Sequence, residues 1–414
     1  MASDTIADLA AVWKRQKRNW RIIAIRQCFN RFFMEMTRSY TNIYIMLLGA
    51  SPIQLGIINS FLGISNTIIS VPMGWLQDRY NLRKLFIMGI GLLAIVPLIY
   101  ANAPDWIYII PAIIIMAIAS KEASCMVLCN VCLDNRDRLT AKGICEGIGR
   151  IPSLAAPIIA SFIIAYLGGI NLKSIQFLYW IQFGARFILF IYIYTQLTDI
   201  IIPKKSDETI KKPSFMTSFK ELFAKFRNLK KWILFCSLGA FIRIMMMSFR
   251  YPFAYSIKNS NEYIIGLSVT SSILLQVILY IPLGRLSDKI GRKKVLFMLM
   301  PITWISYLLF VFSPNPGILV FALFLSGIEG IVMVIYNAIS AELVTPEYMG
   351  RWIGIIGLFS GLSTIPAPIL GGYIWDYFGP EYIFILPIFI DIILRIPLLV
   401  SIPETLNIKY LKSD

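Results

Sequence analysis

The chain has 414 residues, of which 57% are hydrophobic and 15% charged, and its formal net charge is +16. A soluble protein of this size needs a polar exterior that this composition does not supply, so a soluble fold is excluded. The basic residues gather in short loops between apolar segments, which points to a membrane and excludes a nucleic-acid-binding protein.

Twelve apolar segments recur along the chain, each near the ~20 residues with which a helix crosses a bilayer. Their predicted ranges are 22–48, 52–73, 85–103, 106–132, 141–167, 174–197, 232–257, 262–283, 294–313, 317–341, 350–374 and 380–402. A polar and then basic N-terminus leads into the first segment, and we expect no cleavable signal peptide before it. The sequence therefore predicts an all-α integral membrane protein.

The loops between these segments differ in charge. Basic residues cluster before the first segment and after the second, fourth, sixth and eighth, whereas the alternate loops hold only Lys173 and Lys258. This positive-inside pattern predicts a multi-pass protein of the cell membrane with both termini in the cytoplasm.

The stretch 27–48 of the first segment carries three charges in an apolar setting. Arg31, Glu35 and Arg38 lie at i, i+4 and i+7, and Asn42 follows at i+11, which on a helix forms one polar stripe. A charge at the centre of a bilayer costs at least ~2.5–3.5 kcal/mol, so such residues face a partner or a wet cavity. The stripe is therefore a candidate solute or proton site.

The fourth and fifth segments carry further charges at a similar predicted depth. A buried carboxylate near an arginine binds and releases a proton as its partner moves, because desolvation and the cation shift its protonation in opposite directions. With no histidine in the chain, carboxylates must couple transport to protons. The predicted proton-coupling residues are Glu35, Glu122, Glu146 and Arg150, with Glu329 as a further candidate carboxylate.

Six cysteines lie in or beside the predicted helices. Cys125, Cys129 and Cys132 share one helix face, a spacing that could hold a metal ion. The absence of histidine and the frequent use of small residues between membrane helices favour packing instead. We predict no metal site, no cofactor and no disulfide framework.

The two halves of the chain resemble each other. The stretch "GWLQDRYNLRKLF" from Gly74 recurs as "GRLSDKIGRKKVLF" from Gly284, 210 positions later. Trp20 and the two arginines of the first segment recur 212 positions later, and a mid-segment arginine recurs after 209. The recurring pairs are Trp20 and Trp232, Arg31 and Arg243, Arg38 and Arg250, and Arg186 and Arg395. The predicted domains are an N-terminal six-helix bundle (1–198), a basic cytoplasmic linker (199–231) and a C-terminal six-helix bundle (232–414).

Together these features resemble the major facilitator superfamily, whose signature Gly-x-x-x-Asp-Arg/Lys-x-Gly-Arg-Arg/Lys joins helices 2 and 3. The second copy here is complete, whereas the first has Asn81 and Leu82 where glycine and a basic residue are usual. The resemblance covers the whole chain and implies two pseudo-symmetric six-helix bundles that alternate in access. It also implies a gating role for Gly74, Asp78, Arg79, Arg83, Gly284, Asp288, Lys289 and Arg292.

In this superfamily helices 1, 4, 7 and 10 line the central path. The resemblance implies that Arg31 or Arg38 faces Arg243 or Arg250 across one cavity, where guanidinium groups suit anionic oxygens. The alternative is that each arginine is neutralised within its own bundle. Under that alternative Glu35 pairs in the first segment, and Glu329 is the expected partner of Arg243. The predicted substrate-binding residues are Arg31, Glu35, Arg38, Arg243, Arg250 and Glu329.

The resulting prediction is a proton-coupled secondary transporter, and not an enzyme, that moves a small polar and anionic solute as a monomer. The rivals are export of drugs or lipid-linked molecules, and a membrane sensor that binds solute without moving it. In the fifth segment "PSLAAPIIAS" stands where antiporters of the family carry a glycine-rich element, which weakens the export reading. "IPET" at 402–405 is similar to the end of sugar-carrying members.

Overall fold

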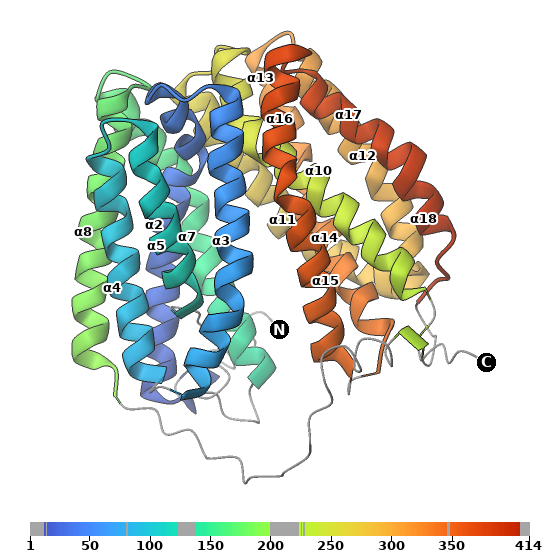
Figure 1. Cartoon of the computed structure of the whole chain (residues 1–414), viewed down its shortest axis with the longest axis horizontal. Helices are drawn as coiled ribbons and strands as arrows, with labels where there is room; N and C mark the ends of the chain where they lie inside the picture. The colour runs from blue at the N-terminus through green and yellow to red at the C-terminus, as the bar shows by residue number, and fades with distance from the viewer. Residues whose placement is uncertain are drawn as a thin grey trace. The chain divides into compact units, whose positions relative to one another are not determined.

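A computed structural model describes residues 12–13, 15–79, 82–122, 138–198, 223–224, 226, 228–345 and 348–405. The elements described there are helices (Figure 1). They belong to two compact units. The first comprises 1–49, 65–206 and 261–266, and the second comprises 50–64, 207–260 and 267–414.

The first unit is built on a long, charged helix and its neighbours. Its elements are α2 (Arg18–Leu47), the later part of α3 (Pro52–Arg79), α4 (Leu82–Ala101), the short η1 (Trp106–Tyr108), α5 (Ile109–Glu122), α7 (Arg138–Tyr166) and α8 (Leu172–Gln196). Helix α2 packs against α7 and α8, while α4 packs against α5 and α8. Trp20, Ile23 and Phe86 are fully buried in its apolar core.

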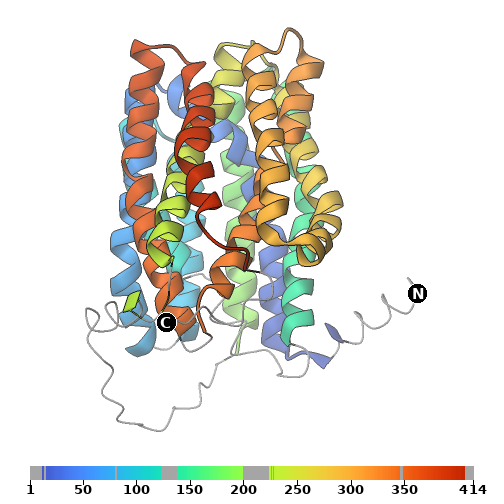
Figure 2. The same cartoon turned by 90° about the vertical axis from the view of Figure 1, so that its right-hand side faces the viewer.

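The second unit repeats this plan with more interruptions (Figure 2). Its elements are α10 (Leu229–Ser256), most of α11 (Glu262–Ile290), α12 (Arg292–Phe312), α13 (Pro316–Leu325), α14 (Ile328–Glu342), α15 (Met349–Thr364), α16 (Pro366–Tyr377), α17 (Tyr382–Ile390), the π-helical turn η3 (Asp391–Arg395) and α18 (Ile396–Val400). Helix α10 packs against α15 and α16, and α12 packs against α13, α14 and α17.

The described helices match the twelve predicted segments. Eight helical stretches are long and apolar enough to cross a membrane, and three shorter apolar stretches lie at 52–65, 106–120 and 150–166. The remaining segment is α2, which is 30 residues long and carries the charged stripe. The predicted fourth segment extends to 132, but the residues from 123 onward lie outside the described part.

Three predicted segments are less regular than expected. The tenth is broken at Ser326–Gly327 between α13 and α14, and the eleventh is broken at Ile365, just before Pro366. The twelfth contains the π-helical turn η3, in which the backbone is wound more loosely. The mean hydropathy of a segment does not reveal such breaks, because it averages over all the residues of the segment.

The internal repeat is visible in the burial of equivalent residues. Trp20 and Trp232 are both fully buried, each in the core of its own unit. Arg186 and Arg395 are likewise buried, and Arg186 donates to the Leu93 carbonyl at 2.9 Å. These residues, which are equivalent by their spacing in the sequence, are therefore also buried in the same way.

Candidate functional site

The charged stripe of the first segment forms an ion pair within α2. Arg38 Nη1 lies 2.9 Å from Glu35 Oε1, and the Glu35 side chain is 13% exposed while that of Arg38 is 53% exposed. Arg31, one turn before Glu35, is partly buried on the same face. The Glu35 carboxylate is therefore mostly buried, whereas the Arg38 side chain is largely exposed.

The equivalent arginines of α10 have a different environment. Arg250 Nη2 lies 2.6 Å from Glu329 Oε1 of α14, and the two side chains are 14% and 17% exposed. Arg243 Nη1 contacts Met247 Sδ at 3.6 Å. The predicted pairing of Glu329 with Arg243 is therefore wrong. Glu329 pairs with the arginine two turns further along α10.

The break between α13 and α14 positions Glu329. Tight turns precede α14, where Gly327 N donates to Phe324 O and Glu329 N to Ser326 O, both at 3.0 Å. Glu329 then falls in the first turn of α14, where the helix dipole favours a negative charge. The break therefore places the Glu329 carboxylate at the start of a helix, within reach of Arg250.

Glycines allow α11 to approach this break closely. A Cβ on Gly327 would collide with the Ser272 carbonyl oxygen, and one on Gly330 would lie 2.5 Å from Gln276 Oε1. Only glycine leaves room for the backbone of α11 at the first position. The glycines on either side of Glu329 therefore fix its helix against α11.

The remaining predicted proton-coupling residues are described unevenly. Arg150 lies on α7 and is exposed. Glu122 ends α5 and Glu146 lies on α7, but their side chains lie outside the described part of the structure. Their predicted role stays a prediction.

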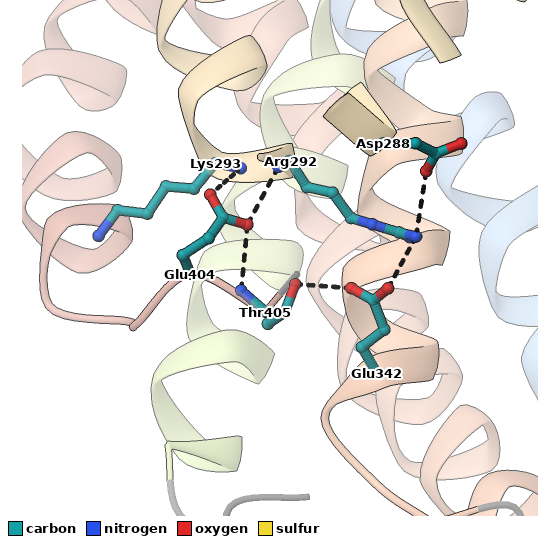
Figure 3. Close-up of polar contacts among 6 residues, drawn as sticks. All are labelled: Asp288, Arg292, Lys293, Glu342, Glu404 and Thr405. Atoms are coloured by element: carbon teal, nitrogen blue, oxygen red, sulfur yellow. Dashed lines mark hydrogen bonds and ion pairs between the residues drawn. The ribbon is translucent and has the colours of Figure 1, made fainter. Parts of the chain in front are cut away.

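The second copy of the signature forms a network at the junction of α11 and α12 (Figure 3). Arg292 Nη2 lies 2.7 Å from Glu342 Oε1 at the end of α14, and 3.4 Å from Asp288 Oδ1. Gly291 has φ +107°, and a Cβ there would lie 2.5 Å from Glu404 Oε2. The turn therefore requires glycine for its backbone and for its contact with the C-terminal segment.

The segment after α18 completes this network. Glu404 accepts the backbone N–H groups of Arg292 at 3.0 Å and Lys293 at 3.1 Å, so it satisfies two open donors at the start of α12. Thr405 Oγ1 donates to Glu342 Oε2 at 2.7 Å, and Lys293 Nζ donates to the Ile402 carbonyl at 2.6 Å. Ion pairs and hydrogen bonds thereby join the end of α11, the start of α12 and the end of α14 to the last described residues.

The sequence signature predicts only part of this network. Gly284, Asp288, Lys289 and Arg292 were assigned from the signature, and the structure shows Lys289 exposed and Gly284 within α11. Glu342 was missed because no motif marks it. The "IPET" of 402–405 is similar to the end of sugar-carrying members, but this similarity predicts no role for Glu404.

The first copy of the signature lies at the end of α3 and the start of α4. Gly74, Asp78 and Arg79 belong to the last turns of α3, and their side chains lie outside the described part of the structure. Arg83 lies in the first turn of α4 and is partly buried. The gating role of this copy stays a prediction.

Comparison with known proteins decides the family. The sequence profile of the Major Facilitator Superfamily matches residues 27–261 and 236–406. The chain belongs to this superfamily. It is therefore a multi-pass membrane transporter rather than an enzyme, and the predicted twelve-helix fold is confirmed.

Members of the Major Facilitator Superfamily similar to this chain differ in their described cargo. An uncharacterized MFS-type transporter of Methanocaldococcus jannaschii is 22% identical over 400 residues, which cover 89% of this chain and 91% of that protein. The class B tetracycline resistance protein of Escherichia coli is 30% identical over 134 residues, or 32% of this chain and 33% of that protein. A mutant of the nucleoside transporter NupG has a similar fold, with a TM-score of 0.77 at 13% identity over 93% of this chain and all of that one.

Proposed function

We propose that this chain is a proton-coupled, alternating-access transporter that moves a small polar anionic solute across the cell membrane. We propose that it acts as a monomer. The basic loops support an orientation with both termini in the cytoplasm. The observation that carries the proposal is that each unit combines two arginines with one carboxylate, and that the carboxylate binds one of those arginines.

The charges of these residues favour an anionic cargo. In the first unit Arg31, Glu35 and Arg38 sum to one positive charge, and in the second unit Arg243, Arg250 and Glu329 give the same sum. Guanidinium groups bind carboxylate, phosphate or sulfate oxygens in pairs and hold their charge at all physiological pH values. A solute with such a group would complement the positive charge of these arginines.

Glu329 is suited to carry the coupling proton. Among the described residues it accepts from Arg250 alone, through Oε1. When Glu329 takes up a proton, its attraction for Arg250 falls, and the guanidinium becomes available to an anionic solute. Proton and solute then bind together, which is the basis of symport, and loss of the proton restores the Arg250–Glu329 pair.

The network around Arg292 is suited to act as a cytoplasmic latch. The Arg292 side chain is 16% exposed, and it joins the α11–α12 turn to the end of α14 through its ion pair with Glu342. Such a network stabilises one arrangement of these helix ends and must open for the other. Alternating access then depends on the difference between the two arrangements rather than on any cofactor.

Transport by purified protein in proteoliposomes tests this function. A library of radiolabelled organic and phosphorylated anions is offered with an inward proton gradient, and accumulation is followed with and without a protonophore. We expect accumulation of at least one anion that the protonophore abolishes, while exchange of that anion continues. Accumulation that the protonophore does not reduce would exclude proton coupling. Uptake of neutral or cationic solutes alone would exclude an anionic cargo.

A second candidate function is export of amphiphilic compounds. Two observations favour it: the partial likeness to a tetracycline resistance protein, and a cavity of about 810 Å³ in the second unit between α10 and α15. Apolar side chains line most of this cavity, with a lysine and two serines among them; the lining residues are Phe223, Ala224, Lys230, Ile233, Leu234, Ser237, Phe359 and Ser363. Proton-driven movement of tetracycline in the same vesicles, without movement of small anions, would favour this function over the first.

A further inference from the structure

A second ion pair lies deep in the second unit, where the twelfth predicted segment is interrupted. Arg395 Nη1 lies 2.6 Å from Asp391 Oδ1, and the two side chains are 7% and 6% exposed. Both residues belong to the π-helical turn η3, of which they are the two ends. Turns of this kind are rare and frequently mark functional sites.

Three other helices hold this pair. Trp304 Nε1 of α12 donates to Asp391 Oδ2 at 2.9 Å, and Arg395 Nη2 donates to Tyr336 Oη of α14 at 2.7 Å. The Arg395 guanidinium lies 4.5 Å from the ring centroid of Phe235 on α10. A Cβ on Gly239 would lie 2.7 Å from Arg395 Nη2, so α10 leaves space for the cation.

The pair is connected to the candidate proton site through α14. Tyr336 and Glu329 are seven residues apart on the same helix, which places them on one face about two turns apart. Helix α14 is therefore fixed at two points, to α10 through Arg250 and to η3 through Arg395. Tyr307 of α12 is buried within electrostatic range of both ion pairs.

We propose that Asp391 and Arg395 are positioning residues that hold α14 in place and thereby set the pH at which Glu329 exchanges its proton. Trp304 and Arg395 can only donate hydrogen bonds, so both oxygens of Asp391 act as acceptors in this arrangement. This inference rests on the proposed proton coupling through Glu329.

The structure describes polar and titratable groups around the two sites on α10, α12 and α14. Glu329 faces Arg250 from α10 and Tyr307 from α12. The Asp391–Arg395 pair faces a further set of groups, which are Cys236 from α10, Trp304 and Tyr307 from α12, and Tyr336 from α14. Of these contacts, only that with Tyr336 reaches the helix that carries Glu329.

Two variants separate positioning from general stability. Tyr336→Phe removes the hydrogen bond between Arg395 and α14 but keeps the aromatic ring. Trp304→Phe removes a hydrogen bond to the same ion pair but leaves the hydrogen bond between Arg395 and Tyr336 of α14 in place. Both are conservative changes in the full-length protein, and both should lower its Tm by a similar, small amount.

The measurement is a pH titration by infrared spectroscopy of the protein in phospholipid bilayers, with the proton as the only ligand. The signal is the carboxylic-acid C=O band that Glu329→Gln removes. We expect Tyr336→Phe to move its midpoint to higher pH by about 0.5 unit or more, because a looser α14 weakens the pairing with Arg250. Trp304→Phe should leave the midpoint unchanged.

Two outcomes would overturn the inference. Identical midpoints in the wild type and Tyr336→Phe would show that the pair does not act on Glu329, and equal shifts in both variants would show a general loosening of the bundle. If the wild type has no band that Glu329→Gln removes, proton binding at Glu329 fails, and the proposed coupling fails with it.

Discussion

Two ion pairs of the second unit, Arg250–Glu329 and Asp391–Arg395, have the same length, 2.6 Å, but their carboxylates are held differently. Asp391 and Arg395 lie four residues apart in one helical turn, and both oxygens of Asp391 accept hydrogen bonds. Glu329 and Arg250 lie on separate helices, and among the described residues one oxygen of Glu329 accepts from that arginine alone. Burial also differs, since the Glu329 side chain is 17% exposed and that of Asp391 only 6%.

This difference indicates which of the two ion pairs can break and re-form during transport. A carboxylate that is surrounded by donors and joined to its own helix has no second arrangement of similar energy. A carboxylate that joins two helices through one contact can lose it to a proton or a solute. We therefore assign rigidity to the Asp391–Arg395 pair and exchange to the Arg250–Glu329 pair, and mutations of each should have unlike effects.

The largest expected effect follows Arg395→Ala. Removing one partner leaves Asp391 as an uncompensated buried charge, which should lower the free energy of unfolding by about 3–5 kcal/mol. Thermal unfolding in detergent measures this loss. The control is the double change Asp391→Leu with Arg395→Met, which removes both charges and should recover most of the stability. A single variant as stable as the wild type would show that the pair is not held as tightly as its contacts indicate.

Next in size is the effect of Glu329→Gln, which should act on transport more than on stability. The amide keeps the shape and can still accept from Arg250, but it cannot bind the coupling proton. Proton-driven accumulation in proteoliposomes should fall by roughly tenfold or more, a loss of about 1.4 kcal/mol in coupling, while solute exchange persists. Loss of exchange and accumulation together would instead place Glu329 in solute binding.

Much of this comparison could be predicted from the sequence. The repeat of 212 residues indicated Arg243 and Arg250 as equivalents of Arg31 and Arg38, and the cost of charge in an apolar helix marked Glu329 as the expected partner of Arg243. The structure pairs Glu329 with Arg250 instead, and the correct choice between the two arginines could not be predicted. It depends on where α14 begins, and the break at Ser326–Gly327 is fixed by packing against α11 rather than by the apolar pattern.

The Asp391–Arg395 pair shows a different limit of sequence reasoning. Arg395 was noted as the repeat of Arg186, yet Asp391 was not recognised as its partner although the spacing of four residues is visible. Their partners Trp304 and Tyr336 come from other helices, and no local pattern connects positions so far apart along the chain. Tertiary packing alone brings these donors to the pair.

A third ion pair provides an intermediate case at the cytoplasmic latch. Arg292 and Glu342 lie 2.7 Å apart with side chains 16% and 26% exposed, whereas Asp288 is 69% exposed and lies 3.4 Å from the same arginine. Glu342→Gln should slow transport by roughly tenfold, because a charged hydrogen bond in the latch is lost. Asp288→Asn should slow it less, since exposed pairs contribute little. Initial rates in proteoliposomes measure both, and the reverse order would contradict the latch drawn from these distances.

The smallest expected effect concerns the first unit and tests whether the repeat extends to energetics. Arg38 and Arg250 occupy equivalent positions, but the Arg38 side chain is 53% exposed and that of Arg250 is 14% exposed. Solvent screens an exposed pair, so Arg38→Gln should lower the free energy of unfolding by less than about 1 kcal/mol. Arg250→Gln should cost more, because solvent reaches the Arg250 side chain less and therefore screens its pair with Glu329 less. Thermal unfolding of both variants side by side gives the order. Equal losses would mean that exposure does not distinguish the two sites, and the pair in α2 would then be as rigid a part of its bundle as its counterpart on α10.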